Sequence, residues 1–544
     1  MKRRILALLL SIASAFTCAF GLSACGGNSG LSIKGASINA AGELVLTLSD
    51  DSTLNLGKVT GNDGKDGEDG KEGVGVSNAY FDEDGNLVVK LTNGKEVVCG
   101  NIVDNSSSYG LYYSEVRENG KVTGYEINSI GIAEDTDIII PALHRGKPVV
   151  GIADNAFSGA KHLTSVTIPD SVTYIGEYAF YNCTDIKSVT VGTGVKSSGK
   201  FAFGKCPSLE SVYISDVAGW CCIQFENASA TPLYFAHKLY VNNELATNIQ
   251  IPDSATQVGD FAFYEVDNIQ SVNIGNGAKR IGESAFFGCI NLKSVTVGNG
   301  VTGIADSAFA CCEKLESAAL GSGVQKIDNY AFYQCYLLKE IALPAKTKTV
   351  GESAFAECSN LKSAILNEGL ESIGDNAFSL CSSLKSFKIP SSVTRLGFGV
   401  LMFGGGGGFE GLNADNSIEE IVLSENLTQI PEFAFSGCNI LTIEIPDKVT
   451  KINYSSFYGC SALKSIVIPT SVKSIVSYAF YNCNSIRSVY YKGTAAEWAK
   501  ITIGRNGNSI SGEGVTIYYY SETAPVSQGN YWRYVEGNPV VWEQ

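Results

Sequence analysis

Hydrophobic and polar positions alternate in short runs along most of the chain and predict one repeated unit. In residues 292–297, LKSVTV, leucine and valine face one side of an extended segment and serine and threonine the other, which is typical of a strand with one buried face. In residues 171–176, SVTYIG, a second short extended segment ends at a glycine. In residues 177–183, EYAFYNC, alanine, phenylalanine and cysteine fall on one side of what we predict to be a single helical or 3₁₀ turn.

An aligned phenylalanine marks this unit at steps of 23 residues, once 22, within blocks of the chain. Self-similarity at this period predicts a solenoid, in which stacked coils bury apolar edges that one coil alone would expose. We expect about 14 coils between residues 137 and 491, with in-register strands about 4.8 Å apart. In a degenerate, glycine-rich coil at 391–417, Leu401 takes the phenylalanine position before the run Gly404–Gly408. The aligned residues are Phe157, Phe180, Phe203, Phe263, Phe286, Phe309, Phe332, Phe355, Phe378, Phe435, Phe457 and Phe480.

Two small modules precede the repeats. Residues 36–59 and 76–105 carry the same alternation of apolar residues and glycine turns, which predicts two antiparallel β-hairpin modules. Between them, in residues 60–75, glycine stands at every third position and the stretch resembles the collagen-like inserts of bacterial surface proteins. Because it contains no proline and only about four triplets, we expect a solvated spacer, with a trimerisation element as the alternative.

The first residues resemble a bacterial lipoprotein leader. MKRR is followed by an apolar run and then by LSAC, so residues 1–24 are predicted to be a signal peptide and Cys25 the lipid-modified residue, with 25–35 as a tether. A transmembrane anchor and an ordinary signal peptide are the alternatives. The lipoprotein interpretation predicts an exported chain, anchored by lipid to the bacterial cell membrane and facing its extracellular side.

The ends of the repeat array and one insert depart from the pattern. We predict an N-terminal cap at 106–136 and a C-terminal cap of helix and hairpin at 492–544, because the terminal coils of a solenoid expose apolar faces. An insert at 215–250 reads as a short amphipathic helix followed by a hairpin. The last coil leads into a similar sequence, in which Trp498 takes the place of Trp220.

The repeat cysteines occur once per coil and are predicted to be buried, reduced thiols. Zinc needs four ligands that converge on one point, which a row of cysteines along an axis does not supply. Disulfides between coils are the alternative, because the chain is exported, but parallel Cβ vectors fit the required dihedral poorly. Cys222 and His237 could form part of a metal site, but two ligands are too few to prefer over packing.

Charge and motif content exclude several functions. The formal net charge of −15, or −18 without Lys2, Arg3 and Arg4, argues against nucleic acid as a partner. Only three histidines are present, and nucleophile-elbow, zinc-protease and phosphate-loop motifs are missing from the sequence. We therefore expect neither an enzyme nor a cofactor or metal.

The repeat Ile-Gly-x-x-Ala-Phe-x-x-Cys-x-x-Leu-x-x-Val-x-Ile-Pro, over residues 137–491, resembles the leucine-rich repeats of the BspA type, which are bacterial cell-surface proteins. The resemblance implies a right-handed, β-rich leucine-rich-repeat solenoid. It also implies adhesion, because characterised members are associated with binding to host or bacterial surfaces.

These observations lead to a non-enzymatic binding protein that presents its solenoid to host proteins, glycans or other cells. The alternative is a structural or substrate-capturing envelope lipoprotein that assists a partner enzyme or transporter. Aromatic anchors concentrate binding energy at interfaces, so the predicted ligand contacts are aromatic residues of the outward strand rows, the insert and the C-terminal region. They are Tyr213, Trp220, Tyr234, Tyr490, Trp498 and Trp532.

Overall fold

The computed structural model describes residues 110–403, 416–526 and 528–543, together with Gly94, Ser108 and six strands between residues 33 and 101. Cys25, the glycine-triplet spacer and the run Gly404–Gly408 lie outside the described residues. The chain divides into two compact units, residues 1–105 and residues 106–544, and each is treated by itself.

The first unit contains two antiparallel sheets of the same topology. Each has three strands in chain order, so each module is a meander with one strand more than the predicted hairpin. The additional strand follows from stability, because an isolated two-stranded hairpin is marginal in water. The strands are β1 (Ile33–Ile38), β2 (Glu43–Leu48), β3 (Thr53–Lys58), β4 (Val76–Phe81), β5 (Asn86–Leu91) and β6 (Glu96–Asn101).

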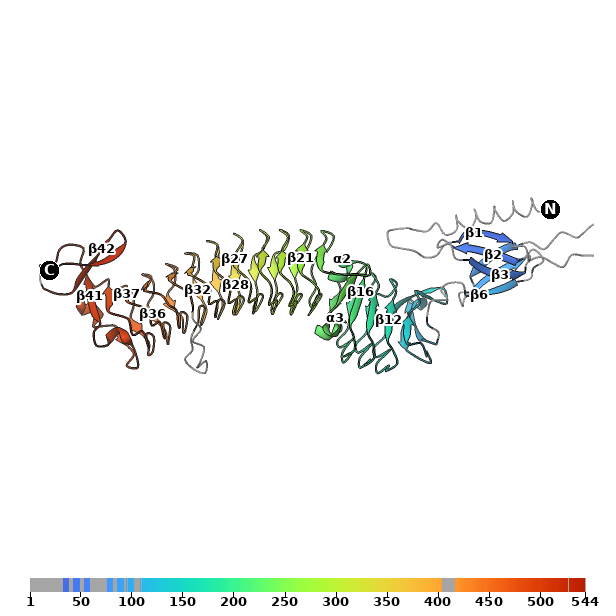
Figure 1. Ribbon diagram of the computed structural model, residues 1–544, viewed down its shortest axis with the longest axis horizontal. Coiled ribbons are helices and arrows are strands. Elements are labelled where there is room, and N and C mark those ends of the chain that lie inside the picture. Colours follow the sequence, from blue (N-terminus) through green and yellow to red (C-terminus); the bar gives the residue numbers. More distant parts are fainter. Residues whose placement is uncertain are drawn as a thin grey trace, which may run out of the picture. The chain divides into compact units, whose positions relative to one another are not determined.

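The second unit is a β-solenoid of about 15 turns with about 23 residues per coil (Figure 1). Its first side is a ladder of parallel strands that pair in register at the repeat interval, as in Ser165↔Ser188↔Ser211. Valine and isoleucine point into the core, and serine and threonine alternate with them on the outer face, as the pattern predicted. The strands of this long-strand side are β9 (Asp137–Ile139), β12 (Ser165–Ile168), β14 (Ser188–Val191), β16 (Ser211–Ile214), β18 (Leu239–Val241), β20 (Asn248–Ile251), β21 (Ser271–Ile274), β23 (Ser294–Thr296), β25 (Ser317–Ala319), β27 (Glu340–Ala342), β29 (Ser363–Ile365), β31 (Ser386–Lys388), β33 (Glu420–Val422), β35 (Thr442–Glu444), β37 (Ser465–Ile468), β39 (Ser488–Tyr491) and β41 (Thr516–Tyr520).

The second side is a parallel ladder of mostly two-residue strands, each contributing one inward side chain in the regular coils. It confirms the predicted second extended segment. The strands are β11 (Lys147–Ile152), β13 (Tyr174–Ile175), β15 (Ser197–Ser198), β17 (Gln224–Phe225), β22 (Arg280–Ile281), β24 (Gly303–Ile304), β26 (Lys326–Ile327), β28 (Thr349–Val350), β30 (Ser372–Ile373), β32 (Arg395–Leu396), β34 (Gln429–Ile430), β36 (Lys451–Ile452), β38 (Ser474–Ile475) and β40 (Thr502–Ile503).

The third side, which we name the turn wall, consists of the residues from two before to two after each aligned phenylalanine. We predicted a helical or 3₁₀ turn here, but the segment is a run of hydrogen-bonded turns that alternate between two partners. Ala310 N donates to Ser307 O of its own coil at 3.1 Å, whereas Phe309 N donates to Ala331 O of the next coil at 2.8 Å. Alternate N–H groups therefore bond along the solenoid axis, which a helical turn could not achieve because its N–H groups bond within the turn.

Stacked phenylalanine rings and buried thiols fill the core behind the turn wall. Phe286 and Phe309 lie 5.1 Å apart with almost parallel rings, and the stack extends through Phe378. The Sγ of Cys312 lies 3.2 Å from Phe286 O in the preceding coil, and the other repeat cysteines repeat this hydrogen bond. The predicted burial of the repeat cysteines is confirmed. Each thiol gives the phenylalanine carbonyl a hydrogen-bond partner that no backbone N–H of the next coil supplies.

The insert at 215–250 is a modified coil. Both ladders continue into it, since β15 pairs with β17 and β16 with β18, and β18 then turns back into β19 (Glu244–Leu245). Helix α2 (Val217–Cys221), the 3₁₀ turn η1 (Ala228–Ala230) and α3 (Leu233–Ala236) occupy the rest of this coil. The degenerate coil behaves as predicted at its centre, where Leu401 is fully buried and accepts the thiol hydrogen bond of Cys438 at 3.4 Å.

Additional elements close both ends of the solenoid. At the N-terminal end, β7 (Tyr112–Glu118) and β8 (Lys121–Ser129) form a hairpin whose second strand pairs with β11, which also pairs with β10 (Leu143–His144). At the C-terminal end the ladders extend beyond residue 491 through β40 and β41, so the region predicted as cap contains one more coil. The remaining elements are α4 (Ala495–Trp498), η2 (Ser509–Ser511), β42 (Tyr531–Val535) and β43 (Asn538–Val541). Within the described residues, every helix is too short to span a membrane.

Candidate binding surfaces

Two of the six predicted ligand contacts are core residues. Trp220 is 3% exposed and its Nε1 donates to Ala262 O at 2.7 Å, which joins the insert to the following coil. Trp532 is fully buried and its Nε1 donates to Tyr491 O at 2.9 Å. The prediction that these indoles contact a ligand is wrong, because an insert and a cap need large apolar side chains to replace the missing neighbouring coil.

The other four predicted contacts are half-buried and lie in different parts of the solenoid. Tyr213 stacks on Tyr240 of the next strand at 4.7 Å, on the outer face of the long-strand side. Tyr490 stacks on Tyr518 at 5.5 Å on the same side, near the C-terminal end.

The remaining two belong to the insert and to its C-terminal counterpart. Tyr234 stacks on Tyr264 of the turn wall at 5.6 Å, and Trp498 packs edge-on against Tyr491 at 5.2 Å. The structure therefore does not bring the predicted contacts together in one site.

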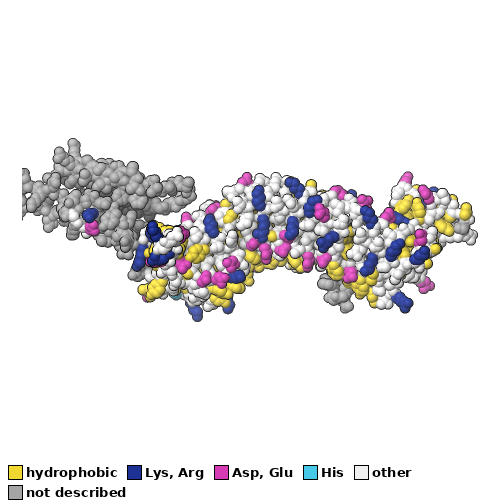
Figure 2. All heavy atoms as spheres, turned by 180° about the vertical axis from the view of Figure 1, so that it is seen from behind, with side chains coloured by type: hydrophobic (Ala, Val, Ile, Leu, Met, Phe, Trp, Pro, Cys, Tyr) yellow, Lys and Arg dark blue, Asp and Glu magenta, His cyan; other side chains and the backbone are white. Residues whose placement is uncertain are grey.

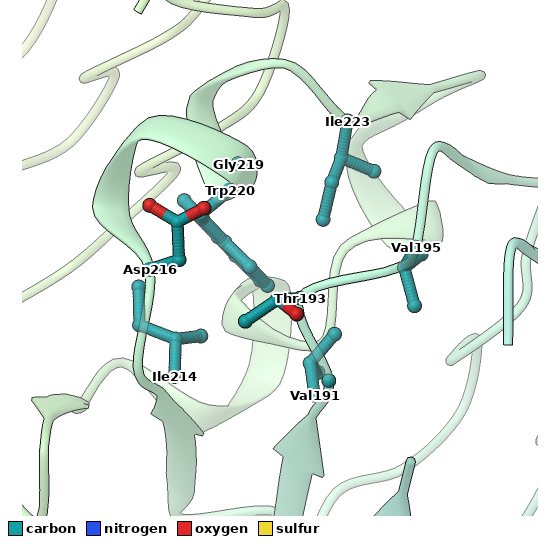
Figure 3. A pocket seen from close by; sticks show the side chains of 9 residues that line it. Val191, Thr193, Val195, Ile214, Asp216, Gly219, Trp220 and Ile223 are labelled. Carbon is teal, nitrogen blue, oxygen red and sulfur yellow. The ribbon is translucent and has the colours of Figure 1, made fainter. Parts of the chain in front are cut away.

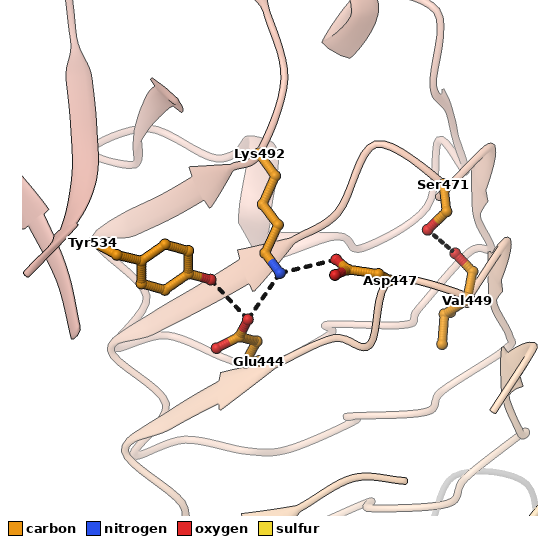
Figure 4. A network of polar contacts seen from close by, with 6 residues as sticks. All are labelled: Glu444, Asp447, Val449, Ser471, Lys492 and Tyr534. Atoms are coloured by element: carbon orange, nitrogen blue, oxygen red, sulfur yellow. Dashed lines mark hydrogen bonds and ion pairs between the residues drawn. The ribbon is translucent and has the colours of Figure 1, made fainter. Parts of the chain in front are cut away.

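The C-terminal hairpin folds over the long-strand side and is fastened there by a polar network, named here the latch (Figure 4). Tyr534 Oη donates to Glu444 Oε1 at 2.7 Å, across 90 residues of sequence. Lys492 Nζ lies 2.9 Å from both Glu444 Oε1 and Asp447 Oδ1. Burial would lower the pKa of Lys492, but hydrogen bonds to Asp447 and Glu444 outweigh it and raise that pKa. The aromatic residues around this hairpin therefore serve the cap.

The outer face of the long-strand side satisfies much of its own polarity. Side chains in adjacent coils bond to one another, as in Ser271 Oγ to Asn248 Oδ1 at 2.6 Å and Lys339 Nζ to Glu316 Oε2 at 2.5 Å. On the face seen in Figure 2, basic and acidic side chains are interspersed along the solenoid. This arrangement leaves no large field of one sign there that would attract a highly charged partner.

The turn wall carries rows of aromatic side chains that our sequence analysis missed. They occupy the positions two before and one after the aligned phenylalanine and are mostly half-buried or exposed, in contrast to the buried rings behind them. A signal was present, since YAFYNC occurs at 178–183 and again at 478–483, and YAFYQC at 330–335. These aromatic rows comprise Tyr178, Tyr181, Phe201, Phe261, Tyr264, Phe287, Tyr330, Tyr333, Phe433, Tyr458, Tyr478 and Tyr481.

Neighbouring members of the aromatic rows stack along the axis. Tyr264 and Phe287 are 5.1 Å apart with rings 12° from parallel, and Tyr458 and Tyr481 are 5.2 Å apart. The hydrogen-bonded turn wall fixes their backbone, so little conformational freedom remains to be lost when a partner binds.

An open groove of about 470 Å³ lies at the C-terminal end of the turn wall. Its floor includes Asn508, whose side-chain Oδ1 accepts from Phe480 N at 3.1 Å and so replaces the alanine carbonyl of a following coil. Its lining residues are Tyr481, Asn482, Asn484, Ile503, Gly504, Arg505, Gly507, Asn508, Ser509 and Ser511.

A second cavity, between the insert and the coil before it, holds only about 10 Å³. Figure 3 shows Thr193, Val195 and Trp220 around it, with the carboxylate of Asp216 at one side. That carboxylate caps α2 by accepting from Ala218 N at 2.9 Å. The space suits at most one water molecule and cannot hold an organic ligand.

The described residues show no metal-binding group of three or more histidine, cysteine or acidic side chains. Cys222 and His237 do not form one: Cys222 Sγ contacts Thr256 Oγ1 at 3.7 Å, and His237 Nδ1 contacts Glu265 O at 3.0 Å. Both side chains therefore have local packing roles in the insert.

Comparison with known proteins agrees with this architecture. The family described as the BspA type leucine rich repeat region matches in six copies over residues 146–229, 234–337, 291–402 and 411–502. Leucine-rich repeat folds of this kind are generally non-enzymatic scaffolds. A search of curated proteins found no match.

Solved structures of bacterial leucine-rich repeat proteins share the fold. One, from Bacteroides ovatus, is 22% identical with a TM-score of 0.51, and the alignment covers 76% of this chain and 100% of that one. Another, described as a leucine rich cell surface protein from Faecalibacterium prausnitzii, is 26% identical with a TM-score of 0.36, covering 73% and 98%. Since the family match extends over more than half of the sequence, the chain belongs to the BspA-type leucine-rich repeat family.

Proposed function

We propose that this protein is a non-enzymatic surface adhesin that binds a protein or glycan of a host or another cell through its turn wall. The observation that carries the proposal is the set of stacked aromatic side chains, which project from a backbone fixed by hydrogen bonds between coils. Aromatic side chains on a rigid frame supply large contact area at low entropic cost and are enriched among energetically dominant interface residues.

The proposal includes export and lipid anchoring at Cys25. Its support is the leader sequence, in which a basic start and an apolar run precede LSAC at residues 22–25. Incorporation of labelled palmitate into the wild-type chain, and its loss in Cys25→Ser, is the expected outcome. Equal labelling of the two chains would refute the anchor without touching the adhesion proposal.

The adhesion proposal is tested by binding of the full chain to intact host and bacterial cells and to arrays of host proteins and glycans. We expect saturable binding that falls at least tenfold when Tyr178, Tyr181 and Tyr330 are changed together to serine. The matched control changes Asn273 and Thr296 on the outer long-strand side to serine and should bind as the wild type does.

Two outcomes would overturn the assignment. Equal binding by the turn-wall variant and the control would move the contact to another side of the solenoid. Lack of saturable binding to any cell or array would favour the envelope role, in which the solenoid serves a partner enzyme or transporter.

A further inference from the structure

The groove at the C-terminal end of the turn wall has an unusual charge for this protein. The chain has a net charge of −15, yet no aspartate or glutamate is among the ten residues that line the groove. Arg505 lines it, and Arg487 lies beside it, donating through Nη1 to Asn484 O at 2.9 Å. The groove is therefore locally basic on an acidic molecule.

The walls of the groove are fixed by the loop that ends the turn wall. Asn508 is 9% exposed, and its Nδ2 donates to Val476 O and Gly504 O, each at 3.1 Å. The same side chain accepts from Phe480 N, so the loop is bonded to the last coil at three points. A ligand would therefore meet a preformed site rather than a loop that must first become ordered.

Glycine at position 507 keeps space beside the last aromatic ring open. Its φ is +68°, and a Cβ there would lie 2.4 Å from Cδ2 of Tyr481 and 3.1 Å from Cδ1 of Tyr478. Tyr481 stacks on Tyr458 on one side and, within the described residues, is the last ring of that stack. One side of the Tyr481 ring thus borders the groove instead of another coil.

Several polar groups around this ring have no partner within the described part of the chain. The Arg505 guanidinium makes no hydrogen bond or ion pair there, and the same is true of the Asn482 and Asn484 amides and the Ser509 hydroxyl. Arg505, Asn482 and Asn484 are exposed, so they are free to meet a ligand. The set combines an aromatic ring, two planar amides, a hydroxyl and one cationic fork.

We propose that this groove binds an acidic sugar residue, a six-membered sugar ring that carries a carboxylate. The guanidinium matches a carboxylate in bidentate geometry, the amides and the hydroxyl can bond ring hydroxyls, and the tyrosine ring accommodates the apolar C–H face of the sugar. A free phosphate would leave Tyr481 and the amides unused, and a neutral sugar would leave Arg505 unused. A volume of about 470 Å³ holds one or two sugar rings. This inference rests on the proposed adhesive function and names the ligand class of one part of the turn wall.

The test uses the full chain in a detergent without a sugar headgroup and saturation-transfer NMR with three probes. Glucuronate represents uronic-acid polysaccharides, N-acetylneuraminate represents sialylated glycans, and glucose is the neutral control. We expect saturable binding of at least one acidic probe, at least tenfold weaker binding of glucose, and a loss of at least tenfold for the acidic probe in Arg505→Gln.

Matched variants separate binding from folding. Arg395→Gln, on the exposed part of β32, should bind the acidic probe as the wild type does. Tyr481→Phe keeps the ring and should retain binding, whereas Tyr481→Leu should lose it while its circular dichroism and melting temperature stay close to those of Tyr481→Phe.

The proposal is overturned if the wild type binds neither acidic probe, if glucose binds equally well, or if Arg505→Gln and Tyr481→Leu leave affinity unchanged. Saturable cell binding by a wild-type chain that ignores all three probes would reject the sugar site and leave the adhesion proposal standing.

Discussion

At the scale of single residues, the repeat cysteines serve as hydrogen-bonding core residues. Burial raises the pKa of Cys183 to about 12 and that of Cys206 to about 11. The thiolate is the nucleophile in alkylation, and it is scarce where the pKa is this high. Among the described cysteines, only Cys222 and Cys311 are partly exposed. Burial and the neighbouring Glu313 carboxylate raise the pKa of Cys311 as well.

These pKa shifts predict an order of labelling by iodoacetamide at pH 8. Cys222 should react first, Cys311 more slowly, and the repeat cysteines only after unfolding, because their thiols are buried and protonated. Peptide mapping by mass spectrometry assigns each modified site and separates these residues from the cysteines at positions 18, 25 and 99. Rapid labelling of Cys289 in the folded chain would contradict the prediction.

Adjacent phenylalanines offer a matched test of the core stack. Phe286 is fully buried between the rings of Phe263 and Phe309, whereas Phe287 points outward in the aromatic rows. Phe286→Ala should lower the free energy of unfolding by about 3–5 kcal/mol, because it creates a cavity in the stack. Phe287→Ala should cost less than about 1.5 kcal/mol, since much of its surface is already solvated. Urea unfolding followed by circular dichroism measures both, and equal losses would show that the stack adds no stability.

At the scale of the repeated element, the two strands could be predicted and the turn wall could not. Alternation identifies a half-buried strand directly, so Val295 and Ser294 were placed on the correct faces. In the turn wall, however, Ala308 and Phe309 look inward as they would from a helical turn. The distinguishing feature is backbone conformation, with φ of +55° at Ser307 and +58° at Cys311. Residues other than glycine adopt such angles only where neighbouring coils over-determine them, and a single coil does not reveal that.

The left-handed positions leave a trace in residue choice that suggests a test. None of the non-glycine residues with positive φ in the described part of the chain is valine, isoleucine or threonine. Ser307→Val should therefore destabilise the protein by about 1–2 kcal/mol, because a β-branched side chain clashes with the backbone there.

Ser307→Gly is the matched control and should be neutral or slightly stabilising, because glycine adopts this conformation without steric cost. The urea midpoint of each variant relative to the wild type gives the comparison. A stabilised Ser307→Val would mean that the turn wall adopts another backbone conformation in solution.

At the scale of the whole molecule, the sequence predicted a capped stack of coils but misassigned the aromatic residues at its interruptions. Trp220 and Trp532 looked like ligand contacts because they lie outside the regular pattern. Interruptions of a solenoid, however, are the places where a neighbouring coil is missing and large side chains must replace it. The aromatic rows were overlooked for the converse reason: Tyr178 and Tyr478 lie within the regular pattern, and regularity was taken as a sign of packing alone.

The latch connects the chain's last hairpin to a strand three coils earlier, so its strength should depend on pH. Burial, the hydrogen bond to Glu444 and the charge of Glu444 raise the pKa of Tyr534 to about 12. The ordinary value is 10.0, so the folded state favours the protonated hydroxyl. Its contribution to stability is therefore complete below pH 10 and disappears as the pH rises towards 12. Lys492, whose pKa is also raised, loses its charge in the alkaline range as well.

We expect Tyr534→Phe to lower the stability of the C-terminal end by about 1 kcal/mol at pH 8, the value of a partly exposed hydrogen bond to a carboxylate. The difference from the wild type should shrink steadily between pH 10 and pH 11.5, because the wild type loses the same hydrogen bond by deprotonation. Tryptophan fluorescence during urea unfolding reports on this end, since Trp498, Trp532 and Trp542 all lie there. Tyr531→Phe, in the same hairpin but outside the latch, controls for general effects of hydroxyl removal. A difference between Tyr534→Phe and the wild type that stays constant up to pH 11.5 would show that the latch does not hold the hairpin in place.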